Sequence, residues 1–252
     1  MGNELRELYM KESKHSNYQI LPSILKELLK EDELKIQSRY EQERFCYISQ
    51  NLDIKNKVIL DIGGNTGFFT FEAYSSGAKM VKYYEGNIEH AQFVQKAVEI
   101  LKLKNKIDVW PEYYIFGQDQ TKCDVVFLLN VVHHLGDDFD KEENNIWDVK
   151  ERMLLCINSL AEKARVMVFQ MGFNWKGDRN NCLFRNGTKE EMEKFLLEGT
   201  SKYWNIKKIG IAIRNNGGIK YVDMDMKNNV RDDSLGEFLN RPIFIMESKK
   251  VK

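Results

Sequence analysis

From residue 57 onward the chain alternates between short apolar runs and longer stretches in which apolar positions recur every three or four residues. A short apolar run bounded by polar residues is typical of a buried parallel strand, and the longer spacing is typical of an amphipathic helix. The runs predict strands at residues 58–61, 79–85, 107–110, 123–130, 165–170, 205–213, 219–225 and 242–247. The spacing predicts helices that start at residues 68, 87, 146 and 188.

This alternation predicts the α/β class, with a mostly parallel sheet that is covered by helices on both faces. The end of the chain differs from the rest. Residues 205–213 and 219–225 flank Asn215-Asn216-Gly217-Gly218, which is typical of a hairpin turn. We therefore expect an antiparallel edge built by the last strands.

The first 51 residues carry helical spacing for most of their length. Leu5, Leu8 and Met10 begin one pattern, Pro22 begins a second, and residues 36–48 form a third. We expect an N-terminal helical cap or extension over residues 1–51 and the main domain over residues 52–252.

A glycine-rich turn follows the strand at 58–61. Such a turn between a strand and a helix brings backbone N–H groups and a positive helix end close to a ligand. A dinucleotide fingerprint starting at Gly63 would need glycine at 65 and glycine or alanine at 68, where the chain has Asn65 and Phe68. No Gly-Lys-Ser/Thr follows either, so the spacing argues against the phosphate-binding versions of this turn.

The segment Asp61–Gly67, with sequence DIGGNTG, resembles the first motif of the class I S-adenosylmethionine-dependent methyltransferases, acidic-x-G-x-G-x-G. Asn65 replaces the middle glycine, and asparagine tolerates left-handed backbone better than most residues. The resemblance implies a Rossmann-like, doubly wound sheet of about seven strands and S-adenosylmethionine as cofactor, with S-adenosylhomocysteine as product. The residues it assigns to the amino-acid part and sulfonium of the cofactor are Asp61, Gly63, Gly64, Asn65, Thr66 and Gly67.

Two carboxylates follow later strands. Glu85 ends the strand at 79–85, about 20 residues beyond the glycine turn, where this kind of fold binds ribose hydroxyls. The family commonly has an acid after the third strand that accepts from the adenine amino group. The resemblance therefore implies Glu112 for that role, with Tyr113 packed on the base, although Pro111 makes the local backbone path hard to predict.

The predicted helix at 36–48 carries Tyr40 and Arg44 on one face, with Arg39 at its edge. In the family this segment often reaches over the cofactor, and a guanidinium there would clamp the methionine carboxylate. We expect Arg39, Tyr40 and Arg44 to contribute to cofactor binding, and the alternative is an exposed charged helix face.

Residues 129–135, LNVVHHL, resemble the family's motif after the fourth strand, N-V-L-x-H-L. The resemblance places strands one and four side by side and Asn130 at the methionine end of the cofactor. An imidazole is suited to take a proton from an acceptor hydroxyl near neutral pH. We expect His134 to be this base, with His133 as the alternative.

The segment after the strand at 165–170 mixes aromatic and cationic residues. Trp175, Lys176, Arg179 and Arg185 lie within it, and cations in a cleft suit a phosphate or carboxylate. We expect these four residues to bind an anionic acceptor, and the alternative is a polar surface loop.

The chain has 252 residues with 38 basic and 38 acidic side chains, so its net charge is zero. This balance argues against a general nucleic-acid or membrane binder. Four dispersed cysteines and a polar start predict a soluble cytoplasmic protein. The acidic run Asp137, Asp138, Asp140, Glu142 and Glu143 fits no calcium loop, so we predict no metal.

Together these patterns predict a methyltransferase that uses S-adenosylmethionine to O-methylate a small anionic metabolite, phosphorylated or linked to a sugar or nucleotide. The sequence is also reminiscent of enzymes of bacterial surface-polysaccharide (capsule) biosynthesis. The alternatives are an RNA methyltransferase and a catalytically silent partner protein that retains the cofactor site. A nicotinamide dehydrogenase is disfavoured by the glycine spacing.

Overall fold

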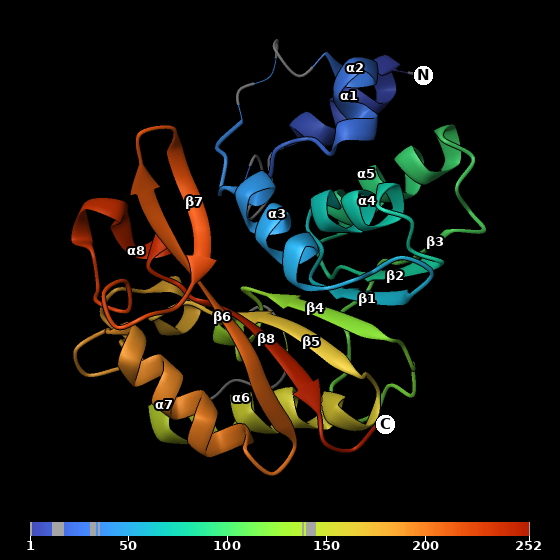
Figure 1. The fold of residues 1–252 in the computed structure, drawn as a ribbon. Helices are drawn as coiled ribbons and strands as arrows, with labels where there is room; N and C mark the ends of the chain where they lie inside the picture. The colour runs from blue at the N-terminus through green and yellow to red at the C-terminus, as the bar shows by residue number, and fades with distance from the viewer. Residues whose placement is uncertain are drawn as a thin grey trace. The chain divides into compact units, whose positions relative to one another are not determined.

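The computed structural model describes residues 2–11, 18–30, 34, 36–137, 139 and 145–251. It consists of two compact units, Met1–Tyr114 and Ile115–Lys252 (Figure 1). The predicted helical extension over residues 1–51 lies within the first unit. A domain boundary after residue 51 stays a prediction.

The first unit contains three parallel strands, β1 (Val58–Ile62), β2 (Met80–Tyr84) and β3 (Ile107–Trp110), in the order β3-β2-β1. Helix α4 (Phe68–Ser75) connects β1 to β2, and α5 (Ile88–Ile100) connects β2 to β3. In the register, Tyr84 lies opposite both Ile62 and Trp110. The carboxyl ends of the three strands are therefore level, and the segments that leave them are neighbours.

Three N-terminal helices pack on the helices of this sheet: α1 (Gly2–Met10) contacts α5, while α2 (Ser23–Leu29) and α3 (Glu41–Asn51) contact α4. Leu5, Leu25 and Ile48 are fully buried at these contacts. The helix predicted at 36–48 begins only at Glu41, because Tyr40 has left-handed backbone with φ of 58° and acts as the N-cap. Arg39 and Tyr40 therefore precede the helix, which corrects the prediction that Tyr40 and Arg44 share a helix face.

The second unit contains five strands in the order β4-β5-β8-β6-β7. Their bounds are β4 Val125–Leu129, β5 Val166–Gln170, β6 Trp204–Asn215, β7 Gly218–Asp223 and β8 Ile243–Ser248. Strands β4 and β5 are parallel, and the other pairs are antiparallel. Helices α6 (Ile146–Ser159) and α7 (Lys189–Thr200) pack against each other beside this sheet (Figure 1), and α8 (Gly236–Leu239) precedes β8.

Strand β6 changes its partner along its length. From Trp204 to Gly210 it pairs with β8, and from Gly210 to Asn215 it pairs with β7. The outer part of β6 and the whole of β7 thus form a two-stranded arm that extends past β8 (Figure 1). Its turn is the predicted hairpin after Asn215.

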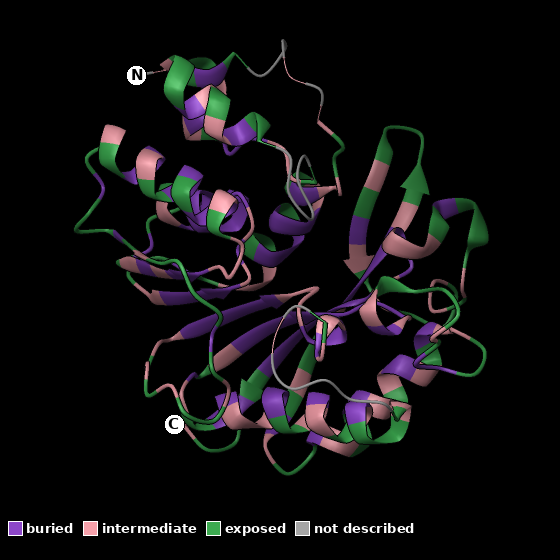
Figure 2. Ribbon diagram, turned by 180° about the vertical axis from the view of Figure 1, so that it is seen from behind, coloured by how far each residue is buried: buried purple, intermediate pink, exposed green. Residues whose placement is uncertain are grey.

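The predicted α/β, Rossmann-like class and its antiparallel edge are confirmed, with eight strands in the described part of the chain where about seven were expected. Two predicted helix starts are also confirmed. Asn87 caps α5 by accepting from the backbone N–H groups of Glu89 and His90, and Thr188 forms a capping box with Glu191 at α7. Strands β1, β4, β5 and β8 are mostly buried, and the helices of both units also carry many buried residues (Figure 2).

The turn between β1 and α4 requires glycine for reasons internal to the protein. A Cβ atom at position 64 would lie 2.6 Å from two ring carbons of Tyr83 and 2.9 Å from Oδ2 of Asp61. Gly67 has φ of 82°, which disfavours any other residue, and a Cβ there would lie 2.9 Å from the Val94 side chain. Neighbouring side chains thus fix both glycines.

We expect Gly64→Ala to lower the free energy of unfolding by about 1–3 kcal/mol, because the added methyl overpacks the contact with Tyr83. Urea denaturation measures this change. Gly217→Ala, where a Cβ would meet no atom closer than 3.6 Å, is the matched control and should change stability by less than about 1 kcal/mol. Equal effects of the two substitutions would contradict the packing explanation.

Candidate functional site

The backbone N–H groups of the glycine turn are all hydrogen-bonded to oxygens of the protein. The acceptors are Tyr84 O for Gly63 and Gly64 (2.8 and 3.2 Å), Glu85 Oε2 for Asn65 (2.8 Å), Asn65 Oδ1 for Thr66 (2.8 Å), Gly64 O for Gly67 (2.9 Å) and Gln19 Oε1 for Phe68 (3.2 Å). The sequence pattern predicted that these N–H groups are presented to a ligand. In the structure they stabilise the turn itself.

Asn65 adopts left-handed backbone with φ of 51°, as expected for the residue that replaces the middle glycine of the motif. Its backbone carbonyl accepts a hydrogen bond of 2.5 Å from the buried Tyr83 hydroxyl. Its side-chain Nδ2 lies 3.3 Å from Nδ1 of the buried His90. These contacts explain why asparagine serves here, since a glycine would lack the side-chain contacts.

Asp61 is buried beneath the turn. Burial raises its pKa to about 7, while hydrogen bonding from Thr70 lowers it and the nearby charge of Glu85 raises it further. The Thr70 hydroxyl donates to Asp61 Oδ2 at 2.6 Å. Near neutral pH this carboxyl group is therefore close to its midpoint of ionisation.

Glu85 is half-buried and connects the glycine turn to the start of α5. Its Oε2 accepts from the Asn65 backbone, and its Oε1 accepts from the Asn87 backbone at 2.8 Å. The Tyr113 ring packs on the next residue, Gly86, so closely that a Cβ there would be 2.1 Å from a ring carbon. A carboxylate and an aromatic ring thus lie at the carboxyl end of β2.

Exposed aromatic surface continues to β3. Trp110 stacks on Tyr84 with ring centroids 5.6 Å apart and planes 5° apart. The side chains of Trp110 and Tyr113 are 41% and 48% exposed, which is unusual for large aromatic residues within one short segment. Glu112 lies between them in sequence and is exposed, and its backbone N–H donates to Trp110 O at 2.9 Å.

Arg44 lies inside the first unit. Its Nη2 is 3.3 Å from Oε1 of the fully buried Glu41, its Nε donates to Arg39 O at 3.1 Å, and its guanidinium lies 4.9 Å from the Phe69 ring centroid. The guanidinium of Arg39 lies over the Tyr18 ring at 4.6 Å. Arg44 is therefore engaged within the protein, and a role at the cofactor stays a prediction for Arg39, Tyr40 and Arg44 alike.

In the second unit, Asn130 follows β4 with left-handed backbone, φ 63°. Its Nδ2 donates to Gln170 Oε1 at 3.0 Å, Gln170 Nε2 donates to Arg241 O at 2.9 Å, and Arg241 Nη1 donates back to Asn130 Oδ1 at 2.8 Å. The Arg241 guanidinium also pairs with Glu237 at 2.6 Å. This closed ring fixes the segment after β4.

Gln170, Glu237 and Arg241 were not among the predicted site residues. Arg241 lies 111 residues from Asn130 in sequence, so no local spacing could have indicated their contact. Only the position of Gln170 at the end of a predicted strand was a signal, since residues at carboxyl ends of parallel strands often contribute to sites.

The two histidines after β4 lie side by side, with ring centroids 4.3 Å apart. His133 is buried, and its ring packs on the backbone of Gly172, where a Cβ would be 2.9 Å away. His134 has a side chain that is 15% exposed, and its Nδ1 lies 3.8 Å from Oδ2 of Asp137. Of the two, His134 is therefore the more accessible.

The predicted acceptor loop packs beside these histidines. The short helical turns Val132–His134 and Trp175–Gly177 contact each other, and the buried Trp175 donates through Nε1 to Leu135 O at 2.7 Å. Lys176 Nζ lies 4.6 Å above the Trp175 ring, and Lys176 is half-buried. Trp175 thus holds the loop in place, and the cationic group of Lys176 lies over its ring.

Arg179 and Arg185, farther along this loop, are exposed. The carboxylate of Asp178, on the same loop, accepts hydrogen bonds from Asn180 and Asn181. The structure therefore brings the predicted base and the start of the predicted acceptor loop together within the second unit.

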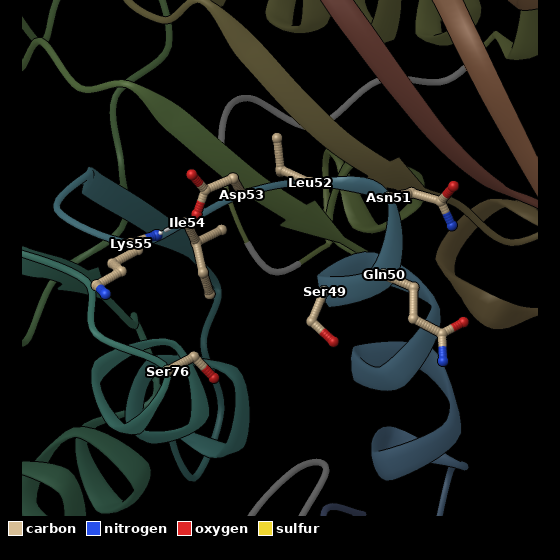
Figure 3. Close-up of a pocket in the computed structure, with 8 residues that line it drawn as sticks. All are labelled: Ser49, Gln50, Asn51, Leu52, Asp53, Ile54, Lys55 and Ser76. Atoms are coloured by element: carbon tan, nitrogen blue, oxygen red, sulfur yellow. Dashed lines mark hydrogen bonds between the residues drawn. The ribbon is translucent and has the colours of Figure 1, made fainter.

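A separate cavity of about 420 Å³ lies where α3 and α4 end (Figure 3). The chain passes this cavity as it enters β1, so the cavity is at the amino end of that strand, opposite to the glycine turn. Open parallel sheets bind ligands at the carboxyl ends of their strands. We therefore do not place the site there. Its lining is Ser49, Gln50, Asn51, Leu52, Asp53, Ile54, Lys55 and Ser76.

Within the described residues, no group of three or more histidine, cysteine or acidic side chains is arranged to hold a metal ion. Four members of the acidic run, Asp138, Asp140, Glu142 and Glu143, lie outside those residues. Within the same part of the chain, no helix has the length and apolar content needed to span a bilayer.

Solved structures share this fold. Magnesium protoporphyrin IX methyltransferase from Synechocystis PCC 6803 with bound SAM matches with a TM-score of 0.51 and 15% identity, covering 98% of this chain and 91% of that chain. The same enzyme with bound SAH gives a TM-score of 0.52 at 14% identity, covering 97% and 93%. A "Putative hemolysin" from Streptococcus thermophilus gives 0.52 at 15% identity, covering 86% and 68%.

No protein-family model matches the sequence, and comparison with curated proteins finds no match. Identities of 14–15% show a shared fold, so function must be argued from the residues of the site.

We expect Asp61→Asn to stabilise the protein at pH 8 by about 1–4 kcal/mol, because the wild-type carboxylate is then ionised in a buried position. Its pKa is raised, so the folded state binds the proton more tightly than the unfolded state. The contribution of Asp61 to stability is therefore greatest below pH 3.8 and is lost as the pH rises to about 7.

Urea denaturation at pH 5 and pH 8 tests this, and the stabilisation should be larger at pH 8. Asp108→Asn, at an exposed position on β3, is the control and should give the same change at both pH values. If Asp61→Asn changes the free energy of unfolding by the same amount at both pH values, the raised pKa of Asp61 is contradicted.

We expect Arg241→Met to lower the free energy of unfolding by about 2–4 kcal/mol, since it leaves Glu237 and Asn130 without their partner. Burial tends to raise the pKa of Glu237, but the charge and hydrogen bonds of Arg241 outweigh this and hold it below its usual value. The ion pair therefore stabilises the protein above pH 4.5. The loss of stability caused by Arg241→Met should shrink as the pH falls below 4.5.

Lys207→Met is the matched control, because Lys207 pairs with Glu247 at 3.2 Å with both side chains 51% exposed. Loss of this exposed ion pair should lower the free energy of unfolding by less than about 1 kcal/mol. Similar losses in the two variants would show that the ring around Asn130 is unimportant for stability.

Proposed function

We propose that the protein is an S-adenosylmethionine-dependent methyltransferase whose cofactor binds at the glycine turn of the first unit. The observation that carries this proposal is the turn's hydrogen bonding. A phosphate site uses free backbone N–H groups, whereas the six N–H groups from Gly63 to Phe68 already donate to protein oxygens. This arrangement favours a nucleoside ligand without phosphate over a dinucleotide.

The groups at the carboxyl ends of β2 and β3 fit such a nucleoside. Glu85 offers a half-buried carboxylate, and each of its oxygens can accept more than one hydrogen bond, as a ribose diol requires. The exposed rings of Trp110 and Tyr113 suit stacking on a purine, and Glu112 beside them suits its amino group. Asp61, Arg39 and Tyr40 are the proposed residues for the amino-acid part, with a carboxylate for its ammonium and a guanidinium for its carboxylate.

When bound, S-adenosylmethionine supplies an electrophilic methyl group on a sulfonium. The residues of this chain then have two tasks, which are to position the acceptor and to remove its proton. We assign proton removal from an acceptor hydroxyl to His134, because it is more accessible than His133 and lies beside Asp137. The acceptor oxygen bonds to the methyl carbon while the bond from that carbon to sulfur breaks.

Lys176, Arg179 and Arg185 support an anionic acceptor, since they place cationic groups on the loop that packs against the histidines. O-methylation of a phosphorylated, sugar-linked or nucleotide-linked metabolite follows as our proposed reaction, and a role in surface-polysaccharide biosynthesis stays a prediction. The net charge of zero weighs against RNA as the acceptor.

The first test is calorimetric binding of S-adenosylmethionine and S-adenosylhomocysteine to the wild-type protein and to Glu85→Gln. We expect micromolar binding by wild type and a loss of at least about tenfold in the variant, because the new amide directs an N–H group at a backbone donor. Glu99→Gln, an exposed substitution on α5, should bind as wild type does.

Folded wild-type protein that binds neither compound would contradict the methyltransferase proposal. A wild-type protein that binds the cofactor but transfers no methyl group to any acceptor would instead be a catalytically silent partner protein. In that case a His133/His134 double variant should leave the function of its partner unchanged. Transfer to RNA with a steep salt dependence would replace the small-molecule acceptor.

A further inference from the structure

The first helical N–H group of α4 is capped from a distant part of the chain. Gly67, the N-cap residue, has no side chain that could accept a hydrogen bond from this N–H group. Oε1 of Gln19 takes this role, accepting from the Phe68 backbone and from the Thr66 hydroxyl, each at 3.2 Å. Gln19 precedes Phe68 by 49 residues, so the N-terminal segment completes the end of the glycine turn.

Contacts on both sides hold Gln19 in this position. The Tyr9 hydroxyl donates to Gln19 O at 2.7 Å, and the Tyr9 ring packs on Phe93 of α5 with centroids 5.3 Å apart. Two ion pairs, from Lys11 to Glu89 and from Lys96 to Glu4, at 2.6 and 2.8 Å, further join this region to α5.

On the other side of Gln19, α2 is joined to α4. The Ser23 backbone donates to Glu72 Oε1 at 2.6 Å, and Leu21 is fully buried. Gln19 is therefore held between contacts to the two helices that flank the turn, which makes its amide a fixed acceptor.

We propose that Gln19 is a positioning residue for the cofactor, acting through the backbone of Thr66–Phe68. This inference rests on the proposed function. Without Gln19, the end of the turn has an N–H group and a hydroxyl that must find other acceptors, so its backbone rearranges and the cofactor binds less tightly. The N-terminal segment is thus part of the cofactor site through its effect on the shape of the turn.

The test compares S-adenosylhomocysteine binding to wild type, Gln19→Ala and Gln19→Glu by calorimetry. We expect Gln19→Ala to raise the dissociation constant about tenfold, and Gln19→Glu, which keeps an acceptor oxygen, to bind within about threefold of wild type. Hydrogen exchange of the Phe68 amide in the ligand-free protein should be faster in Gln19→Ala only.

Glu72→Ala is the matched control, because it loosens the same N-terminal segment from α4 without touching the turn. It should lower the melting temperature while raising the dissociation constant by no more than about twofold, well below the effect of Gln19→Ala. Equal weakening of binding by Glu72→Ala and Gln19→Ala would assign the effect to the segment as a whole and overturn the inference.

Wild-type affinity in Gln19→Ala would also overturn it and leave the proposed function standing. Absence of binding by the wild-type protein would instead contradict the proposed function, and this inference with it. If Gln19→Ala does not fold, Tyr9→Phe serves in its place. It removes only the hydroxyl that holds the Gln19 backbone, and it should weaken binding about twofold, whereas unchanged affinity would overturn the inference.

Discussion

The arrangement of the first unit depends on one constraint: the backbone N–H groups of the glycine turn must find hydrogen-bond acceptors. A chain that passes from β1 to α4 within a few residues leaves a row of N–H groups that need acceptors. Three of the acceptors belong to the turn itself or to the neighbouring strand, and two come from the side chains of Glu85 and Gln19. The position of β2, the start of α5 and the path of the N-terminal segment all follow from this requirement.

The same constraint separates structural from ligand-binding roles of the motif residues. Gly64 and Gly67 are fixed by the Tyr83 ring and by backbone conformation, and Asn65 by its contacts to Tyr83 and His90. Asp61 keeps a carboxyl group that the fold does not need, since a buried carboxyl with a pKa of about 7 is unfavourable for stability at neutral pH. Such a cost is typical of residues at functional sites.

The sequence predicted the regular elements well, because apolar runs and caps such as Asn87 and Thr188 are local features. It misplaced the start of α3, since nothing in the sequence marks Tyr40 as a left-handed residue. In the candidate site, Asp61 and Glu85 were predictable from their spacing around the glycines. Gln19 and Arg241 were not, because each contacts its partner across a long stretch of chain and has no characteristic spacing.

The change of partner along β6 has a consequence for how this chain can vary. Beyond Gly210 the register of β6 is set by β7 alone, and the register of the inner part is set by β8. Side chains on a strand alternate between faces with a period of two residues. Insertions or deletions of two residues on each side of the hairpin turn would therefore keep every remaining residue on its face. The arm is a segment whose length can change in evolution, or by design, without altering the pairing of β5, β8 and the inner part of β6.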